Sequence, residues 1–425
     1  MIKLLQFLSA TTLSVLLVAC GAQNNGGGSA SPANIRFVNA AQDVSLSVTL
    51  NGAAQFSNVQ AANASDYASV AAGTYTIAVT GTSGSLASPA FSVSLSAAQT
   101  YTLMAYVRDG AVVASVITEN QTAPASGNGM LGVTNLSPDS GALDLYVVAP
   151  GTTSLAGLAP AFQSTGFRAA PTWATFVAGT FDVVATAAGN PNDVRLRLAS
   201  VSVSSAQILM LALTGTSGGA LVNTVLLNQA GAVQFVPATN ARVRIVSALP
   251  VSGASPVTAT IGTTSLAPVF APNPGTYTLV AGNTSSYAVS AAGTPIATLP
   301  AATFATGGDF TILVYGTTAS PSVSIFTDIN QLPIVVGDVN LRLVNAGVNV
   351  AGGLTLYDNN VQVASAVGYG AASSYFGVPS ANSVLELVEP SVAPLSTALL
   401  LGPTGSVYSV FVIDGTLTPY VIRDR

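Results

Sequence analysis

Three short motifs in the chain have the spacing of known functional sites. Residues 127–132 read Gly-x-Gly-x-x-Gly, the fingerprint of dinucleotide-binding domains, and residues 215–219 read Gly-Thr-Ser-Gly-Gly, the turn that carries a nucleophilic serine. Residues 139–141, Asp-Ser-Gly, resemble half of an aspartic protease dyad. The first motif runs into a predicted strand instead of a helix, the serine has no histidine to activate it, and no second Asp-Thr/Ser-Gly is present. We therefore interpret all three as loop composition.

The ionisable residues on which catalysis depends are scarce. The 425 residues include 16 acidic side chains, no histidine and one cysteine, and charged residues make up 6% of the chain, against about 25% in an ordinary soluble domain. Without histidine there is no imidazole base, no serine triad and no histidine-ligated metal. One cysteine can form neither an intrachain disulfide nor a zinc cluster.

Paired carboxylates are a remaining route to catalysis, because glycosidases need no histidine. The glutamates are Glu119, Glu386 and Glu389, and the last two differ by three positions in a strand-like run, which places them on opposite faces. The aspartates are scattered singly, and none forms an alternating calcium loop. We expect a protein that is not an enzyme, with no catalytic, cofactor-binding or metal-binding residues.

Two sets of side chains recur at matched positions. Arginine is the second residue of three similar segments, at Arg36, Arg244 and Arg342. An aromatic residue follows near the middle of each repeat, at Tyr67, Trp173, Tyr277 and Tyr375. The arginines either line a binding face or point outward from a strand, with the stem on apolar surface and the charge paired to a carboxylate; we favour the second interpretation, because a fourth similar segment has Gly132 there.

The recurring aromatic residues also have two interpretations. They either stack on sugar rings or occupy repeated core positions, and their strict spacing favours the core. Phe167 and Tyr369 lie outside this spacing and are better candidates for exposed stacking platforms. A nucleic-acid partner is not expected, because the ten arginines are dispersed and the net charge is negative.

The elements that must position these residues begin with an export signal. A positively charged start precedes an apolar run from Leu4 to Val18, which is too short for a comfortable membrane span. Leu17–Cys20 resembles a bacterial lipobox, in which cleavage before the cysteine leaves it N-terminal and lipid-modified. We predict a lipoprotein signal peptide over residues 1–19 and a lipid anchor at Cys20 that attaches the protein to a membrane.

The segment after the cysteine predicts how the folded part is held. Residues 20–33 are rich in small and polar side chains and form a flexible tether, which reaches roughly 20 Å for twelve residues. Gly21 stands where Asp would signal retention in the inner membrane, so we expect an exported protein on the outer membrane. Beyond residue 20 no apolar stretch approaches the length of a spanning helix.

Four segments of similar sequence organise the rest of the chain. Each opens with a short apolar stretch, beginning at Ile35, Leu131, Val243 and Leu341. Each later reaches a strongly apolar segment, namely Tyr101–Val107, Ile208–Thr214, Phe310–Gly316 and Tyr408–Asp414. The two features are 66, 77, 67 and 67 residues apart, and the extra length in the second segment lies around residues 150–165. This regularity indicates an internal repeat.

Within a repeat, apolar and small polar residues alternate, as in Thr74–Thr80, Phe91–Ser96 and Arg195–Ser204. A period of two is typical of strands with one buried face, and Asn51-Gly52, Asp109-Gly110 and Asp414-Gly415 suit tight hairpin turns. We predict an all-β protein of four tandem Ig-like antiparallel β-sandwiches in a row, over residues 34–121, 130–229, 241–331 and 338–425, called repeats 1 to 4 below.

Particular motifs in these repeats resemble a known family. The opening Ile35–Asn39 (I-R-F-V-N), the central Ala72–Thr76 (A-G-T-Y-T) and the later Tyr101–Leu103 (Y-T-L) look like the bacterial domain of unknown function numbered 4397. Repeat 2 keeps Ala178–Phe181 (A-G-T-F), and repeats 3 and 4 are more degenerate, so the resemblance covers about residues 34–425. It implies extracytoplasmic β-domains, often on lipoproteins, and no catalytic residues.

Together these observations predict a non-catalytic, lipid-anchored protein of the cell envelope. The four sandwiches would serve as a structural spacer or as a surface for protein interaction and adhesion. The alternative is a surface lipoprotein that binds carbohydrate. Either function implies a protein or polysaccharide partner that the sequence does not identify.

Overall fold

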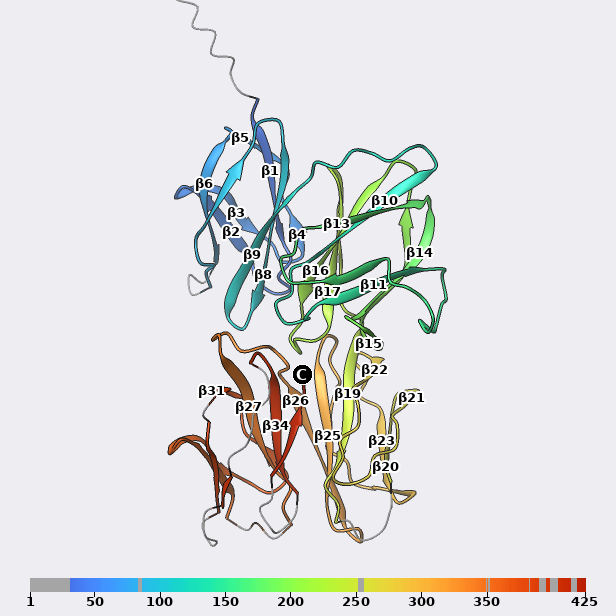
Figure 1. The fold of residues 1–425 in the computed structure, drawn as a ribbon, viewed down its shortest axis with the longest axis vertical. Helices are drawn as coiled ribbons and strands as arrows, with labels where there is room; N and C mark the ends of the chain where they lie inside the picture. The colour runs from blue at the N-terminus through green and yellow to red at the C-terminus, as the bar shows by residue number, and fades with distance from the viewer. Residues whose placement is uncertain are drawn as a thin grey trace, which may run out of the picture.

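The computed structural model describes residues 31–82, 86–250, 256–348, 350, 352–381, 383–389, 395–397, 404–413 and 419–425. Every regular element within these ranges is a strand, so the described part of the chain contains no helix that could cross a membrane. The strands form eight sheets, two in each repeat (Figure 1). The predicted all-β fold with sandwiched sheets is confirmed. Cys20 and the predicted turn at Asp414-Gly415 lie outside the described residues.

Repeats 1 and 2 each contain two sheets, whose strands are named in spatial order. The first sheet of repeat 1 has β4 (Asn63–Ala64), β1 (Ala33–Asn39), β8 (Thr100–Arg108) and β9 (Ala111–Thr118), with β5 (Ala68–Val70) also paired to β1. The second has β3 (Ala53–Val59), β2 (Leu46–Leu50), β6 (Gly73–Gly81) and β7 (Phe91–Leu95). The first sheet of repeat 2 has β13 (Thr172–Val177), β10 (Asn128–Asn135), β16 (Ile208–Gly215), β17 (Val222–Asn228) and β18 (Val233–Val236). The second has β12 (Phe162–Thr165), β11 (Leu143–Val148), β14 (Gly179–Ala187) and β15 (Asn190–Val203).

Repeats 3 and 4 follow the same plan. The first sheet of repeat 3 has β22 (Thr278–Ala281), β19 (Asn240–Ser247), β25 (Asp309–Gly316) and β26 (Pro321–Asp328). The second has β21 (Thr264–Ser265), β20 (Val257–Ile261), β23 (Tyr287–Ala291) and β24 (Thr294–Pro295). The first sheet of repeat 4 has β30 (Ala371–Ala372), β27 (Asp338–Asn345), β34 (Val407–Val412) and β35 (Pro419–Arg423), with β31 (Phe376–Pro379) also paired to β27. The second has β29 (Val361–Val367), β28 (Leu354–Asp358), β32 (Leu385–Val388) and β33 (Leu395–Thr397).

One pairing in each repeat is parallel. The opening strand lies beside the strongly apolar segment, so that β1 pairs with β8, β10 with β16, β19 with β25 and β27 with β34. The remaining pairings between these strands are antiparallel, as predicted. The apolar segment of each repeat does not alternate because both of its faces are covered, which is characteristic of parallel strands.

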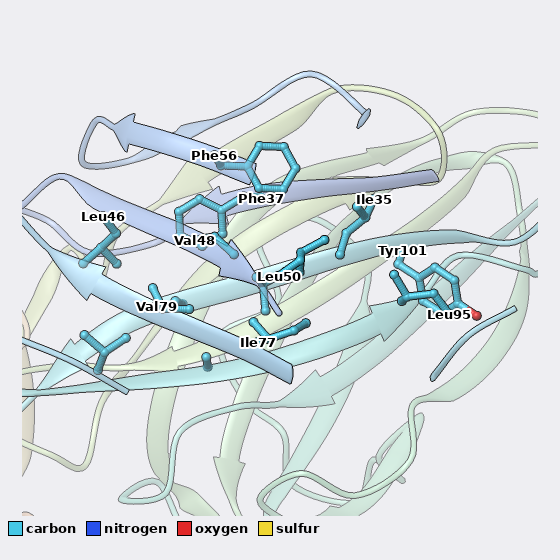
Figure 2. Packing of buried hydrophobic residues seen from close by; sticks show 14 of the residues in the cluster. Ile35, Phe37, Leu46, Val48, Leu50, Phe56, Ile77, Val79, Leu95 and Tyr101 are labelled. Carbon is cyan, nitrogen blue, oxygen red and sulfur yellow. The ribbon is translucent and has the colours of Figure 1, made fainter. Parts of the chain in front are cut away.

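Each pair of sheets encloses one hydrophobic core. In repeat 1, Ile35 and Phe37 of β1 pack across the sandwich against Leu46 and Val48 of β2 (Figure 2), and the Phe37 ring stacks on Phe56. Equivalent clusters fill the other three repeats. Each core is made from the inward residues of the alternating pattern, so the period of two in the sequence predicts it directly.

The turns agree with the sequence, whereas one predicted link does not. Asn51-Gly52 and Asp109-Gly110 have positive φ at both residues, the geometry that tight hairpins need. The predicted repeat boundaries leave a link between residues 229 and 241, but Val233–Val236 form β18 and extend the first sheet of repeat 2. Val233 and Phe235 pack between repeats 1 and 2, which gives this segment a reason to be ordered.

The repeats pack side by side in two pairs and do not form the expected row. The outer faces of the first sheets carry a second set of apolar residues. Val38, Met104 and Tyr106 of repeat 1 meet Met210 and Ala212 of repeat 2 in one cluster. Val246 and Leu313 of repeat 3 meet Val344 and Phe411 of repeat 4 in another. Figure 1 shows these pairs stacked along the long axis, with repeats 1 and 2 above repeats 3 and 4.

Close backbone contact joins the two pairs. Gly218 of repeat 2 donates its N–H to Gly307 O and accepts from Asn330 N, both at 3.0 Å. A Cβ atom on Gly218 or Gly219 would lie 2.7 Å from backbone atoms of repeat 3, so larger residues do not fit. The serine-containing motif at residues 215–219 therefore belongs to a packing junction.

We predict that the faces between repeats stabilise the protein as strongly as the sandwich cores do. Phe411, which lies between repeats 3 and 4, is fully buried, as is Phe37 in the core of repeat 1. Replacement of Phe411 by Ala should lower the free energy of unfolding by about 3–5 kcal/mol, similar to Phe37→Ala. Urea denaturation of both variants measures this, and a loss below about 1 kcal/mol for Phe411→Ala would contradict the pairing.

Candidate functional site

The recurring arginines lie on the outer faces of the first sheets, opposite a hydroxyl group. The parallel registers place Arg36 beside Thr102, Arg244 beside Thr311 and Arg342 beside Ser409. In each case the arginine Nε donates a hydrogen bond to the hydroxyl oxygen, at 2.7, 2.9 and 2.8 Å respectively. The paired positions are 66, 67 and 67 residues apart in sequence, so the repeat length itself brings them together.

A carboxylate from the neighbouring strand completes the hydroxyl contact. Two residues beyond the position opposite the hydroxyl stand Glu119, Asp328 and Asp424. Thr311 donates to Asp328 at 2.5 Å and Ser409 donates to Asp424 at 2.6 Å, and Thr102 donates to Glu119 in the same way. The acid is therefore fixed by a side chain of its own repeat.

The recurring tyrosines lie over these arginines. The ring centres of Tyr67, Tyr277 and Tyr375 are 4.7, 4.7 and 4.9 Å from the guanidinium carbons of Arg36, Arg244 and Arg342. Their hydroxyl groups donate to Glu119, Asp328 and Asp424, at 2.9, 2.6 and 3.5 Å. We call each set of arginine, hydroxyl residue, carboxylate and tyrosine an arginine cluster.

Repeats 3 and 4 exchange charges through their arginine clusters. Arg342 of repeat 4 donates to Asp328 of repeat 3 at 2.5 Å, and Arg244 of repeat 3 lies 2.7 Å from Asp424 of repeat 4. All four side chains are almost completely buried. Each carboxylate is thus held by its own repeat and neutralised by the other, which makes the two clusters one reciprocal interface.

The interface between repeats 1 and 2 is built differently. Arg36 pairs with Glu119 of its own repeat at 3.1 Å and donates to the Gly231 carbonyl of repeat 2 at 2.5 Å. Gln229, which stands at the carboxylate position of repeat 2, exchanges two hydrogen bonds with the backbone of Gln121 in repeat 1, at 2.9 and 2.8 Å. At its cluster positions repeat 2 therefore contributes neutral groups, and the ion pair between Arg108 of repeat 1 and Asp139 of repeat 2 lies elsewhere in the interface.

All four cluster positions of repeat 2 have changed together. They hold Gly132, Met210, Gln229 and Trp173 in place of the arginine, hydroxyl residue, carboxylate and tyrosine. A Cβ atom on Gly132 would lie 2.4 Å from the Trp173 ring. The indole thus occupies the space that the arginine side chain fills in the other repeats, and it packs with the apolar residues between repeats 1 and 2.

Burial and charge pairing determine the ionisation of these groups. Burial alone would raise the pKa of Asp328, but Arg342 and Arg244 hold the pKa of that carboxyl below its usual value. Burial disfavours the charged form of Arg244, yet Asp424 and Asp328 raise its pKa above the ordinary value. Burial raises the pKa of Tyr277 well above its usual range. Asp328 and Arg244 therefore stay charged and Tyr277 stays neutral at physiological pH.

The predictions for the recurring side chains have mixed outcomes. Pairing of the repeated arginines with carboxylates is confirmed, although Arg342 is only 1% exposed and lies between repeats. The prediction that the recurring aromatic residues fill the sandwich cores is wrong, because they lie on the outer faces beside the arginines. Phe167 and Tyr369 are 40% and 43% exposed, as predicted.

The other residues considered from sequence lie apart from one another. Asp139 binds Arg108 through two hydrogen bonds of 2.6 Å and belongs to the junction between repeats. Glu386 is half-buried on β32, and Glu389 is buried. Among the described residues, no group of three or more Cys, Asp or Glu side chains is arranged to hold a metal ion.

The cluster carboxylates were not recognised as a recurring set from sequence, although the sequence holds a signal for them. Glu119, Asp328 and Asp424 follow Arg36, Arg244 and Arg342 by 83, 84 and 82 residues. The sequence positions of these acids look irregular when they are compared with one another. They become regular only when each is measured from the arginine of its own repeat.

Comparison with known proteins identifies part of the chain. A family model described as "Domain of unknown function (DUF4397)" matches residues 33–146. Residues 33–146 contain a DUF4397 domain. The match covers repeat 1, with the arginine cluster of Arg36 and Glu119, and continues through β10 and β11 of repeat 2. None of the curated proteins matches the chain.

Several solved structures resemble the chain at low similarity. The Bacillus anthracis TIE protein is 10% identical, with a TM-score of 0.14, and the match covers 86% of this chain and 66% of that protein. The CBMbc module (family CBM26) of Eubacterium rectale Amy13K, solved with maltoheptaose, is 15% identical, with a TM-score of 0.17 and coverage of 47% and 98%. A "putative cell adhesion protein" from Bacteroides uniformis is 10% identical, with a TM-score of 0.20 and coverage of 48% and 98%. These scores are too low to support an argument about function.

We predict that Asp328 is essential for the interface between repeats 3 and 4. Asp328→Asn should lower the free energy of unfolding by about 3–5 kcal/mol at pH 7, because it leaves the buried Arg342 without its charge partner. The exposed Asp43→Asn should cost little. Since the folded state lowers the pKa of Asp328, its contribution is present above the unfolded pKa of about 3.8 and is lost as the pH falls through the folded value. Urea titrations between pH 3 and pH 7 should therefore show weaker acid dependence in Asp328→Asn; an unchanged dependence would be inconsistent with this role.

A second prediction concerns the altered positions of repeat 2. Gly132→Ala should destabilise the protein by about 1–3 kcal/mol, because the new methyl group collides with the Trp173 ring. In a Trp173→Ala background the same change should cost much less. Gly166→Ala is the control, since a Cβ atom there meets nothing within 4 Å. An equal loss of stability from Gly132→Ala in both backgrounds would refute the proposal that the Trp173 indole fills the space of the arginine side chain.

Proposed function

We propose that the protein is a non-catalytic, lipid-anchored protein of the bacterial cell envelope that acts as a rigid head for interaction or adhesion. The observation that carries this proposal is the use of its charged side chains. In the described part of the chain, six of the ten arginines form ion pairs, and four of the eight pairs join different repeats: Arg108–Asp139, Arg242–Asp193, Arg244–Asp424 and Arg342–Asp328. Eight charged side chains are therefore used to hold the repeats together.

The position of the anchor supports the same proposal. The described chain begins beside repeat 1 at one end of the long axis, and repeats 3 and 4 lie at the other end (Figure 1). A lipid on Cys20 and a tether over residues 20–33 would hold repeats 1 and 2 near the membrane. Repeats 3 and 4 would then face away from it. As a spacer, the paired arrangement would be shorter and stiffer than a row of four sandwiches. We assign the partner surface to repeats 3 and 4, the pair that would lie farther from the membrane.

Replacement of Cys20 by Ser tests the anchor. The variant should lose its lipid and move from the membrane fraction to the soluble fraction, whereas Ser29→Ala in the proposed tether should stay with the membrane. Cell fractionation followed by a high-salt wash measures this. Membrane retention of Cys20→Ser after the wash would show that the anchor assignment is wrong.

One observation favours carbohydrate as the partner in the alternative function. The exposed Tyr369 of repeat 4 contacts Tyr315 of repeat 3 edge to face, with ring centres 4.9 Å apart. Tyr315 also lines a groove of about 800 Å³ with Pro295 and Leu299. Aromatic faces beside a groove suit the apolar faces of sugar rings. A glycan array probed with the full mature protein tests this: Tyr369→Ala should abolish any binding, and equal binding by both proteins would remove the tyrosine pair from consideration.

A further inference from the structure

A polar cavity of about 560 Å³ lies where repeats 2, 3 and 4 meet. Repeat 2 contributes Asp193 and Arg195 from the start of β15, repeat 3 contributes Arg242 from β19, and repeat 4 contributes Arg425, just beyond β35. The volume is within the range of small-molecule sites. None of the functions discussed above uses this cavity.

The side-chain charges around the cavity do not balance. Arg195 pairs with Asp193 at 2.5 Å, and Arg242 pairs with Asp309 through two hydrogen bonds of 2.8 and 2.6 Å. Arg425 forms no ion pair with an acidic side chain in the described part of the chain and donates to backbone oxygens of Gly219 and Asn330, at 3.2 and 2.9 Å. The lining also includes Arg244, which pairs with Asp424 at 2.7 Å, and the exposed Arg423. Apart from these, the three guanidinium groups of Arg195, Arg242 and Arg425 share the two carboxylates of Asp193 and Asp309.

Arg195 is buried and Arg425 is half-buried. Arg195 is 6% exposed, and its Nε is buried without a hydrogen-bond partner. Burial and the nearby charges of Arg195 and Arg242 lower the pKa of Arg425 to about 9. A buried cation without a counter-charge is costly, and an unpaired N–H adds to that cost. One acceptor that carries negative charge and reaches both arginines would offset both costs.

We propose that this cavity binds a small oxyanion, namely a carboxylate, phosphate or sulfate group, through the guanidinium groups of Arg195 and Arg425. The planar fork of arginine donors matches two oxygens of such a group. Arg242, already held by Asp309, adds positive charge at the same place. Because the cavity is formed by three repeats, the anion would tie repeat 2 to repeats 3 and 4.

Thermal unfolding of the full mature chain tests the proposal. Sodium phosphate, sulfate and glucuronate are each titrated at constant ionic strength against chloride. At least one should raise Tm by about 3 °C or more in a saturable manner, since a ligand that binds only the folded state stabilises it. The anion with the lowest Kd by calorimetry distinguishes the three groups. Shifts that do not saturate, or that chloride reproduces, would overturn the proposal.

Matched variants locate the site. Arg195→Gln and Arg425→Gln should each weaken binding of the best anion at least tenfold. Arg168→Gln removes the same charge from a position over the Phe167 ring, outside this cavity, and should leave Kd unchanged. Unchanged affinity in both cavity variants, or an equal loss in Arg168→Gln, would refute the assignment. If either variant fails to fold, the other carries the comparison, and the wild-type titration decides anion binding without them.

Discussion

A guanidinium group buried between two sheets must be matched by a carboxylate within hydrogen-bonding distance, and this constraint determines how repeats 3 and 4 pack. Arg244 and Arg342 lie on facing sheets and are almost fully buried. Each finds its charge partner in the other repeat, at Asp424 and Asp328. Separation of the two sheets would therefore expose a charge or leave it without its partner. Repeats 3 and 4 thus form a single structural unit.

Apolar contact and charge pairing have different effects at these interfaces. The apolar residues on the outer faces supply non-directional stabilisation, which would tolerate many relative positions of two sheets. The ion pairs have fixed partners and short distances, so they select one position. In the pair of repeats 1 and 2, the directional contacts include the Gln229–Gln121 hydrogen bonds and the Arg108–Asp139 ion pair. At the cluster positions of this interface, neutral hydrogen bonds thus take the place of the reciprocal ion pairs.

This arrangement also changes what the chain presents to a partner. In a row of independent sandwiches, both faces of every first sheet would be open. In the paired arrangement, the faces with the recurring arginines and most of the recurring aromatic side chains are covered by a neighbouring repeat. The accessible features are instead the exposed Phe167 and Tyr369, the groove beside Tyr315 and the polar cavity at the junction of repeats 2, 3 and 4.

Local patterns in the sequence determined the strands, the turns and the sandwich cores. Alternation of apolar residues requires one buried face, and Asn51-Gly52 is readily accommodated at positive φ, so both signals act over a few residues. The period of about 67 residues brought Arg244 to Thr311, but the acids that neutralise the arginines were recognised only in the structure. The choice of Asp424 for Arg244 and of Asp328 for Arg342 depends on which sheets face each other. Only the tertiary structure decided this. The second apolar face of each first sheet indicates that another surface must cover it, but it does not identify which repeat supplies that surface.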